Sequence, residues 1–104
     1  MLRRTKTVAI DIASIASHTI IAAVSGKKIN ITSLLFTTGG DVNITLKDGT
    51  TALTGAMDFG GTSEPRGIVA NFGDNAMELT PGNAFVITLS AAIQVSGLVC
   101  YYLS

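Results

Sequence analysis

The residue types that most often carry out catalysis are few in this sequence, and they are scattered. His18 is the single histidine and Cys100 the single cysteine. A nucleophilic site needs an acid, a base and a nucleophile that converge, and the chain contains no G-x-S-x-G turn. We therefore interpret His18 as a surface or strand-end residue and Cys100, among apolar neighbours, as a small buried hydrophobic residue. A single cysteine also excludes a disulfide within the chain.

The acidic residues lie singly, mostly at expected turns. Asp41 and Asp74 each stand beside a glycine, where carboxylates can bind calcium. Aspartate in such places also forms Asx turns without any metal, and we favour that interpretation. No spacing pairs two carboxylates as in a glycosidase, and no glycine run continues into a phosphate-binding loop. We thus expect no catalytic, cofactor-binding or metal-binding residues, and no enzymatic activity.

The low charge of the chain indicates which classes of partner it can bind. Seven basic and seven acidic residues give zero net charge, and only 13% of the 104 residues are charged, against roughly 25% in ordinary domains. Zero net charge lacks the basic footprint of nucleic-acid binding. Apolar runs such as 20–24 are far shorter than the ~20 residues of a membrane-spanning helix. We expect neither nucleic acid nor membrane as partner. Because interfaces are depleted in charge, a homo-oligomer is favoured.

A period of two dominates the hydrophobic pattern, which indicates β-strands. Residues 42–47 alternate between apolar and polar, and Asp48-Gly49 then predicts a hairpin with a returning strand at 52–57. Residues 85–89 alternate after the turn 80–83. The other strands are expected at 5–12, 19–24, 27–36, 67–72, 76–79 and 94–103.

Eight or nine short strands predict an all-β fold, a single antiparallel β-sandwich that is jelly-roll-like. We expect it to span residues 8–104, after a basic N-terminal arm at residues 1–7.

Two of the expected strands are apolar on both faces, namely 27–36 and 94–103. In the first, we assign Ile29, Ile31 and Leu35 to one face and Leu34 and Phe36 to the other. A sandwich buries only one face of each sheet, so a second subunit is expected to cover the remaining apolar face. The residues expected in that interface are Leu34, Phe36, Tyr101 and Tyr102.

Five short blocks, in their order along the chain, resemble small virion proteins of tailed bacteriophages. The blocks are 24–29 (VSGKKI), 53–55 (LTG), 80–84 (TPGNA), 89–92 (LSAA) and 95–97 (VSG). The resemblance spans about residues 20–102, whereas 57–72 matches no pattern of that group. It implies a one-domain capsid decoration, or cement, protein, often a trimer, that sits on a shell of major capsid protein. The implied location is the capsid surface of a virion, after synthesis in the host cytoplasm.

No list of functional residues comes with this resemblance, so the capsid contacts are inferred from charge and loop position. The basic cluster of the N-terminal arm and the charged residues of the longest expected loop are the candidates: Arg3, Arg4, Lys6, Glu64 and Arg66. Two alternatives stay open, a tail-fibre or neck component and a carbohydrate-binding β-sandwich module.

Overall fold

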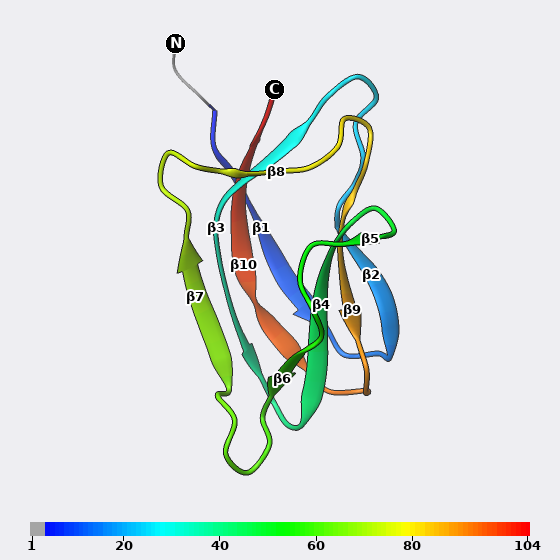
Figure 1. The fold of residues 1–104 in the computed structure, drawn as a ribbon, viewed down its shortest axis with the longest axis vertical. Coiled ribbons are helices and arrows are strands. Elements are labelled where there is room, and N and C mark those ends of the chain that lie inside the picture. The colour runs from blue at the N-terminus through cyan, green and yellow to red at the C-terminus, as the bar shows by residue number, and fades with distance from the viewer. Residues whose placement is uncertain (1–3) are drawn as a thin grey trace.

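A computed structural model describes residues 4–104, and every regular element in that part of the chain is a β-strand (Figure 1). The strands are β1 (Lys6–Ile12), β2 (Ala16–Ile21), β3 (Ile29–Thr38), β4 (Val42–Asp48), β5 (Thr51–Ala52), β6 (Met57–Phe59), β7 (Gly67–Asn71), β8 (Met77–Glu78), β9 (Phe85–Leu89) and β10 (Val95–Leu103). Among the same residues there is no helix long and apolar enough to cross a membrane.

The strands form two antiparallel sheets that pack face to face. Sheet A has the order β1-β10-β3-β7, with β8 also paired to β3, and sheet B has the order β2-β9-β4-β5, with β6 also paired to β4. Since β7 and β8 share one edge of β3, and β5 and β6 share one edge of β4, the strands fill four positions in each sheet. This alternation of strands between two four-position sheets is the jelly-roll order. The predicted all-β sandwich is confirmed.

The core lies between the two sheets and is built from side chains that alternate inward along each strand. Ile31 of sheet A and Ile44, Phe85 and Ile87 of sheet B are fully buried. Phe36 and Phe59 meet edge to face across the two sheets, with ring centroids 5.1 Å apart and planes at 73°. Such aromatic pairs add to the burial of apolar area, so this contact ties β6 to the centre of sheet A.

A β-bulge in β3 changes which of its side chains enter the core. Tyr101 pairs with Ile31 while Cys100 pairs with Ser33, so Thr32 is an extra residue on β3. Its hydroxyl donates a hydrogen bond of 3.1 Å to the Cys100 carbonyl oxygen. An extra residue shifts the alternation by one position and turns the following side chains to the opposite face.

The sequence analysis placed Ile29 and Ile31 on the opposite face from Leu34 and Phe36, and this assignment was therefore wrong. Ile29 and Ile31 precede the bulge and Leu34 and Phe36 follow it, yet all four are buried at 3% exposure or less. Leu35 points outward and is 37% exposed. In β10, where the sequence is apolar on both faces, Val95 and Val99 are fully buried.

Some strand bounds differ from those expected. The returning strand at 52–57 is split into β5 and β6, and the strand expected at 19–24 begins earlier, at Ala16. β1 begins at Lys6, so the boundary expected between arm and sandwich at residues 7 and 8 falls inside this strand.

Asp48, at the end of β4, is hydrogen-bonded to the turn at residues 80–83. Its carboxylate accepts hydrogen bonds from the Thr80 backbone N–H (3.0 Å), the Thr80 hydroxyl (2.8 Å) and the Asn83 side-chain amide (3.0 Å). Burial alone raises the pKa of Asp48, but these donors outweigh burial and hold the pKa below its ordinary value of 3.8. The carboxylate form therefore stabilises the folded chain.

We expect Asp48→Asn to lower the free energy of unfolding by about 1–3 kcal/mol at neutral pH, because the amide turns N–H groups toward donors. A lowered folded pKa stabilises the fold above the unfolded pKa, and that part is lost as the pH falls through the folded pKa. The difference between wild type and variant is thus expected to shrink below roughly pH 4. Urea unfolding at neutral and acidic pH measures it. Asp58→Asn, at an exposed position of β6, is the control; an Asp48→Asn loss that is the same at both pH values would contradict the assignment.

Candidate functional site

The outer face of sheet A carries an apolar row that crosses the whole sheet. The strand register places Ala9 of β1 beside Leu98 of β10, Leu98 beside Leu35 of β3, and Leu35 beside Val69 of β7. All four alternate with core residues and so point away from sheet B. Exposure rises toward the β7 edge, from half-buried Leu98 to 37% for Leu35 and 80% for Val69. We call this set of four residues the apolar row.

The rows on either side of the apolar row are small and polar. They pair Thr7, Cys100, Ser33 and Asn71 on one side, and Asp11, Ser96, Thr37 and Gly67 on the other. Asp11 is the single charged residue in these two rows, and it accepts a hydrogen bond of 2.7 Å from Gln94. A flat face with little charge is typical of surfaces that contact other proteins rather than of catalytic clefts.

A shallow groove continues the apolar row at the edge of sheet A. It has a volume of about 350 Å³ and is lined by residues 35–37 of β3 and 66–69 around the start of β7. Ile68, which belongs to the inner side of β7, is 38% exposed here because the strand lies at the edge. Val69 and Ile68 thus give this edge an apolar border on both sides of the strand.

An apolar pocket of about 210 Å³ lies between the sheets, near β6 and β7. Its walls include two of the residues expected in a subunit interface, Leu34 and Phe36, which are only 3% and 1% exposed. Because the bulge turns both side chains into the core, they are covered by the chain itself and offer no surface to a second subunit. A pocket of this size with apolar walls can hold a small apolar group.

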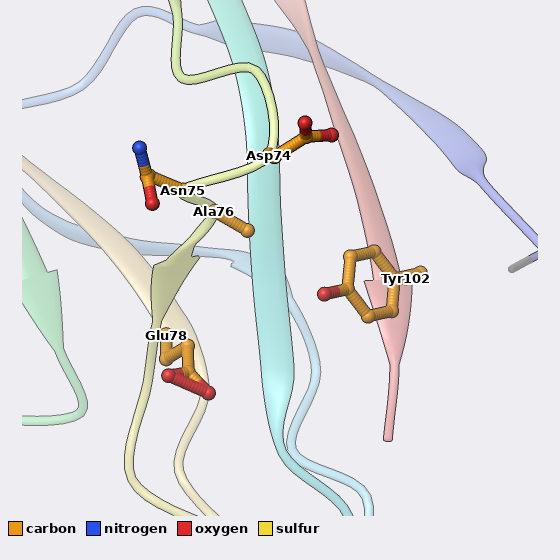
Figure 2. Close-up of a pocket in the computed structure, with 5 residues that line it drawn as sticks. All are labelled: Asp74, Asn75, Ala76, Glu78 and Tyr102. Carbon is orange, nitrogen blue, oxygen red and sulfur yellow. The ribbon is translucent and has the colours of Figure 1, made fainter.

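A polar pocket of about 300 Å³ lies at the other end of sheet A, lined by residues 74–76, Glu78 and Tyr102. Figure 2 shows the Tyr102 ring on β10 directed across β3 toward the segment that carries Ala76 and Glu78. Glu78 forms an ion pair with Lys28. Within residues 4–104 no group of three His, Cys, Asp or Glu side chains is placed to hold a metal ion.

The two expected tyrosines point to opposite faces of β10. Tyr101 pairs with Ile31 on the inner face, and Tyr102 pairs with Asn30 on the outer face. Both are half-buried. Tyr102 is therefore the expected interface residue that remains on the outer side of sheet A.

The charged residues expected to contact a capsid lie at two ends of the molecule. Lys6 pairs with Tyr101 near the chain termini, whereas the Arg66 carbonyl oxygen accepts a hydrogen bond from Thr38 at the far end of β3. Figure 1 shows these ends at the top and bottom of the long axis. Arg4 is exposed beside Lys6, and Arg3 lies outside the described residues.

Glu64 has a local structural contact. Its carboxylate accepts a hydrogen bond of 3.0 Å from the Gly61 backbone N–H and closes the loop between β6 and β7. Glu64 is half-buried and Arg66 is exposed. Arg66 therefore remains the more accessible of the two charges at this end.

The two residues considered first for catalysis have ordinary surroundings. His18 lies on the edge strand β2, with its Nε2 2.7 Å from the Ser14 carbonyl oxygen. Cys100 was expected to be buried, but it points outward from β10 and is half-buried, with its sulfur 3.7 Å from the Thr7 hydroxyl. The alternation of β10 explains this, because Cys100 follows the core residue Val99.

No protein-family model matches the sequence, and no curated protein matches it. Among solved structures, the fold is similar to a chain in the cryo-EM structure of the giant freshwater prawn Macrobrachium rosenbergii extra small virus (XSV) VLP. The TM-score is 0.51 at 19% identity, over 97% of this chain and 78% of that chain.

A second similar structure comes from Bacillus endospore appendages, described as a family of disulfide-linked pili. The TM-score is 0.39 at 18% identity, over 96% of this chain and 84% of that chain. That similarity is too distant to carry an argument. The similarity to the viral chain concerns the fold alone.

The apolar row was only partly visible in the sequence. The segment 67–72 was expected to be a strand, but Val69 was not singled out. Three consecutive apolar residues, 68–70, indicate a strand with apolar side chains on both faces. That signal points to Val69 once the position of β7 at the sheet edge is known.

Adjacent leucines on β3 allow a direct test of the two faces. We expect Leu34→Ala to lower the free energy of unfolding by about 2–5 kcal/mol, because it leaves a cavity in the core. Leu35→Ala, the matched change on the outer face, is expected to cost at most about 1 kcal/mol. Chemical denaturation of both variants measures the difference. Equal losses would mean that the bulge does not set the two faces as described.

Proposed function

We propose that this chain is a non-enzymatic structural protein of a virion, which self-associates and decorates the capsid shell. The observation that carries the proposal is the apolar row on an outer sheet face with almost no charge. An exposed apolar surface on a small domain marks a contact with another protein. The proposal includes no nucleic acid and no membrane as partner.

Two further observations support a virion role. The jelly-roll order is the fold of many viral capsid domains, and a chain of similar fold forms the XSV VLP. Four of the five blocks that resemble small virion proteins of tailed bacteriophages lie at turns or bends of the sandwich, and the fifth, 95–97, begins β10. One of them, the turn at residues 80–83, is the turn held by Asp48.

The major capsid protein is the proposed partner of the basic end of the molecule. Arg3, Arg4 and Lys6 bring three positive charges within four residues, whereas Glu64 and Arg66 at the other end cancel. Electrostatic attraction to an acidic surface of the shell therefore favours the basic end. The molecule measures 46 × 24 × 21 Å, so contact through one end leaves the faces of both sheets open to neighbouring copies.

The test uses particles of the encoding virus that lack this chain. Because a ligand specific for the assembled state stabilises that state, adding the purified chain is expected to raise the temperature at which the particles release their genome. Release is followed by the fluorescence of a nucleic-acid dye. Saturable binding with no change in that temperature would remove the cementing role, and no binding at all would remove the capsid as partner.

Matched charge reversals locate the contact. Arg4→Glu combined with Lys6→Glu is expected to weaken capsid binding at least about tenfold, while Arg66→Glu at the opposite end leaves it unchanged. All three side chains are exposed, so the variants are expected to fold as wild type does. The reverse result would place the contact at the loop between β6 and β7.

A further inference from the structure

β7 presents one side of its backbone to solvent. The Thr38 N–H donates to the Arg66 carbonyl oxygen (2.8 Å) and the Phe72 N–H donates to the Thr32 carbonyl oxygen (2.9 Å). Backbone groups in an antiparallel pair point alternately toward and away from the partner strand. The even-numbered residues 66–72 therefore bond to β3, and the odd-numbered ones, Gly67, Val69 and Asn71, direct their N–H and C=O groups outward. No strand of residues 4–104 pairs with that side.

The free side of β7 lacks the usual protection against strand pairing. Natural sheets guard their edges with charged side chains, bulges or very short strands. β1, at the other edge of sheet A, carries Lys6 and Asp11, and in sheet B the edges are the bulged β2 and the short β5 and β6. β7 has five residues without charge or bulge.

We infer that β7 pairs with β7 of a second copy, antiparallel, about a two-fold axis at Val69. In this register Val69 lies opposite Val69 of the second copy, and Gly67 lies opposite Asn71. All of these are odd-numbered, so the register uses every N–H and C=O group that β7 turns outward. It makes one continuous sheet from the two copies of sheet A, a known mode of recognition between proteins.

The side chains fit the same register. The apolar row ends at Val69, so the two-fold axis joins the rows of the two copies into one band across the combined sheet. Arg66, the nearest charge, lies three residues from the axis. The two copies of Arg66 are thus about 20 Å apart along the strands, at ~3.3 Å per residue, which exceeds the ~8 Å screening length at physiological salt. β7 itself, residues 67–71, brings no like charges together.

This contact rests on the self-association proposed above and specifies its geometry. A two-fold contact forms a dimer, whereas the resemblance to cement proteins implies a trimer. The mass of the assembly therefore separates this inference from self-association in general, and capsid binding is measured independently of both.

Light scattering on the full chain over a concentration series measures the mass. We expect it to rise from one chain to two, and Val69→Lys to raise the dissociation constant at least about tenfold because two lysines meet at the axis. Ile15→Lys, at a position 62% exposed in the turn between β1 and β2, is the matched control and is expected to dimerise as wild type does. A trimer unaffected by Val69→Lys would overturn the contact and leave self-association intact. A wild-type monomer at every concentration would overturn the contact as well.

Disulfide cross-linking tests the register in the Cys100→Ser background. Residues opposite each other in a hydrogen-bonded antiparallel pair have Cα atoms about 5.5 Å apart, within the range that a disulfide spans. Val69→Cys is expected to give covalent dimers on oxidation. Asn71→Cys, whose two copies lie about 13 Å apart in this register at ~3.3 Å per residue, is expected to give none. Equal cross-linking of both variants, or cross-linking only at residue 71, would overturn the register.

Discussion

The extra residue Thr32 in β3 decides how the central strand of sheet A divides its side chains between the core and the surface. Without it, the apolar residues of the two halves of β3 would face opposite sides of the sheet. With it, both halves contribute to the core, and Leu35 alone among the leucines of this strand points outward. The bulge also coincides with a break in the neighbouring edge. β8 pairs with residues 30–31, before the bulge, and β7 pairs with residues 33–37, after it.

The consequences of that division extend to the edge of the sheet. β7 pairs with the half of β3 that follows the bulge, and this pairing sets which of its side chains face inward. Ala70 therefore faces the core and Val69 faces outward. The same pairing register decides which backbone N–H and C=O groups of β7 remain unpaired. A single residue in the centre of sheet A thus determines both the end of the apolar row and the hydrogen-bonding groups at the free edge.

The sequence predicts the local features of this fold well. Strict alternation in 42–47, the glycine of the Asp48-Gly49 turn and the turn at 80–83 are short-range signals, and each corresponds to a strand or turn of the structure. Asp48 itself shows the limit of that reasoning. It was identified as a turn residue, but its three hydrogen bonds go to a turn 32 and 35 residues away, which no local pattern indicates.

The candidate site could not be predicted from the sequence either, because it depends on contacts between segments that are far apart in the chain. Leu34 and Phe36 were expected in an interface because alternation was counted along one strand, and a bulge is visible only in the register between two strands. Residues 67–71 resemble a strand buried on both faces, since nothing within the segment says that it lies at an edge.

The structure also shows where on the molecule charged side chains are depleted. Averaged over the chain, it predicts covered surface without saying where. In the fold, the charged side chains of sheet A lie on β1 and near the ends of the strands, where Lys6, Asp11 and Arg66 are found, and the apolar row and β7 have none. An edge without charge is costly for a monomer, because it invites pairing with any exposed strand. The contrast between β7 and the guarded edges of the same molecule therefore favours growth by extension of sheet A over stacking of its face, since stacking would require no difference between the edges.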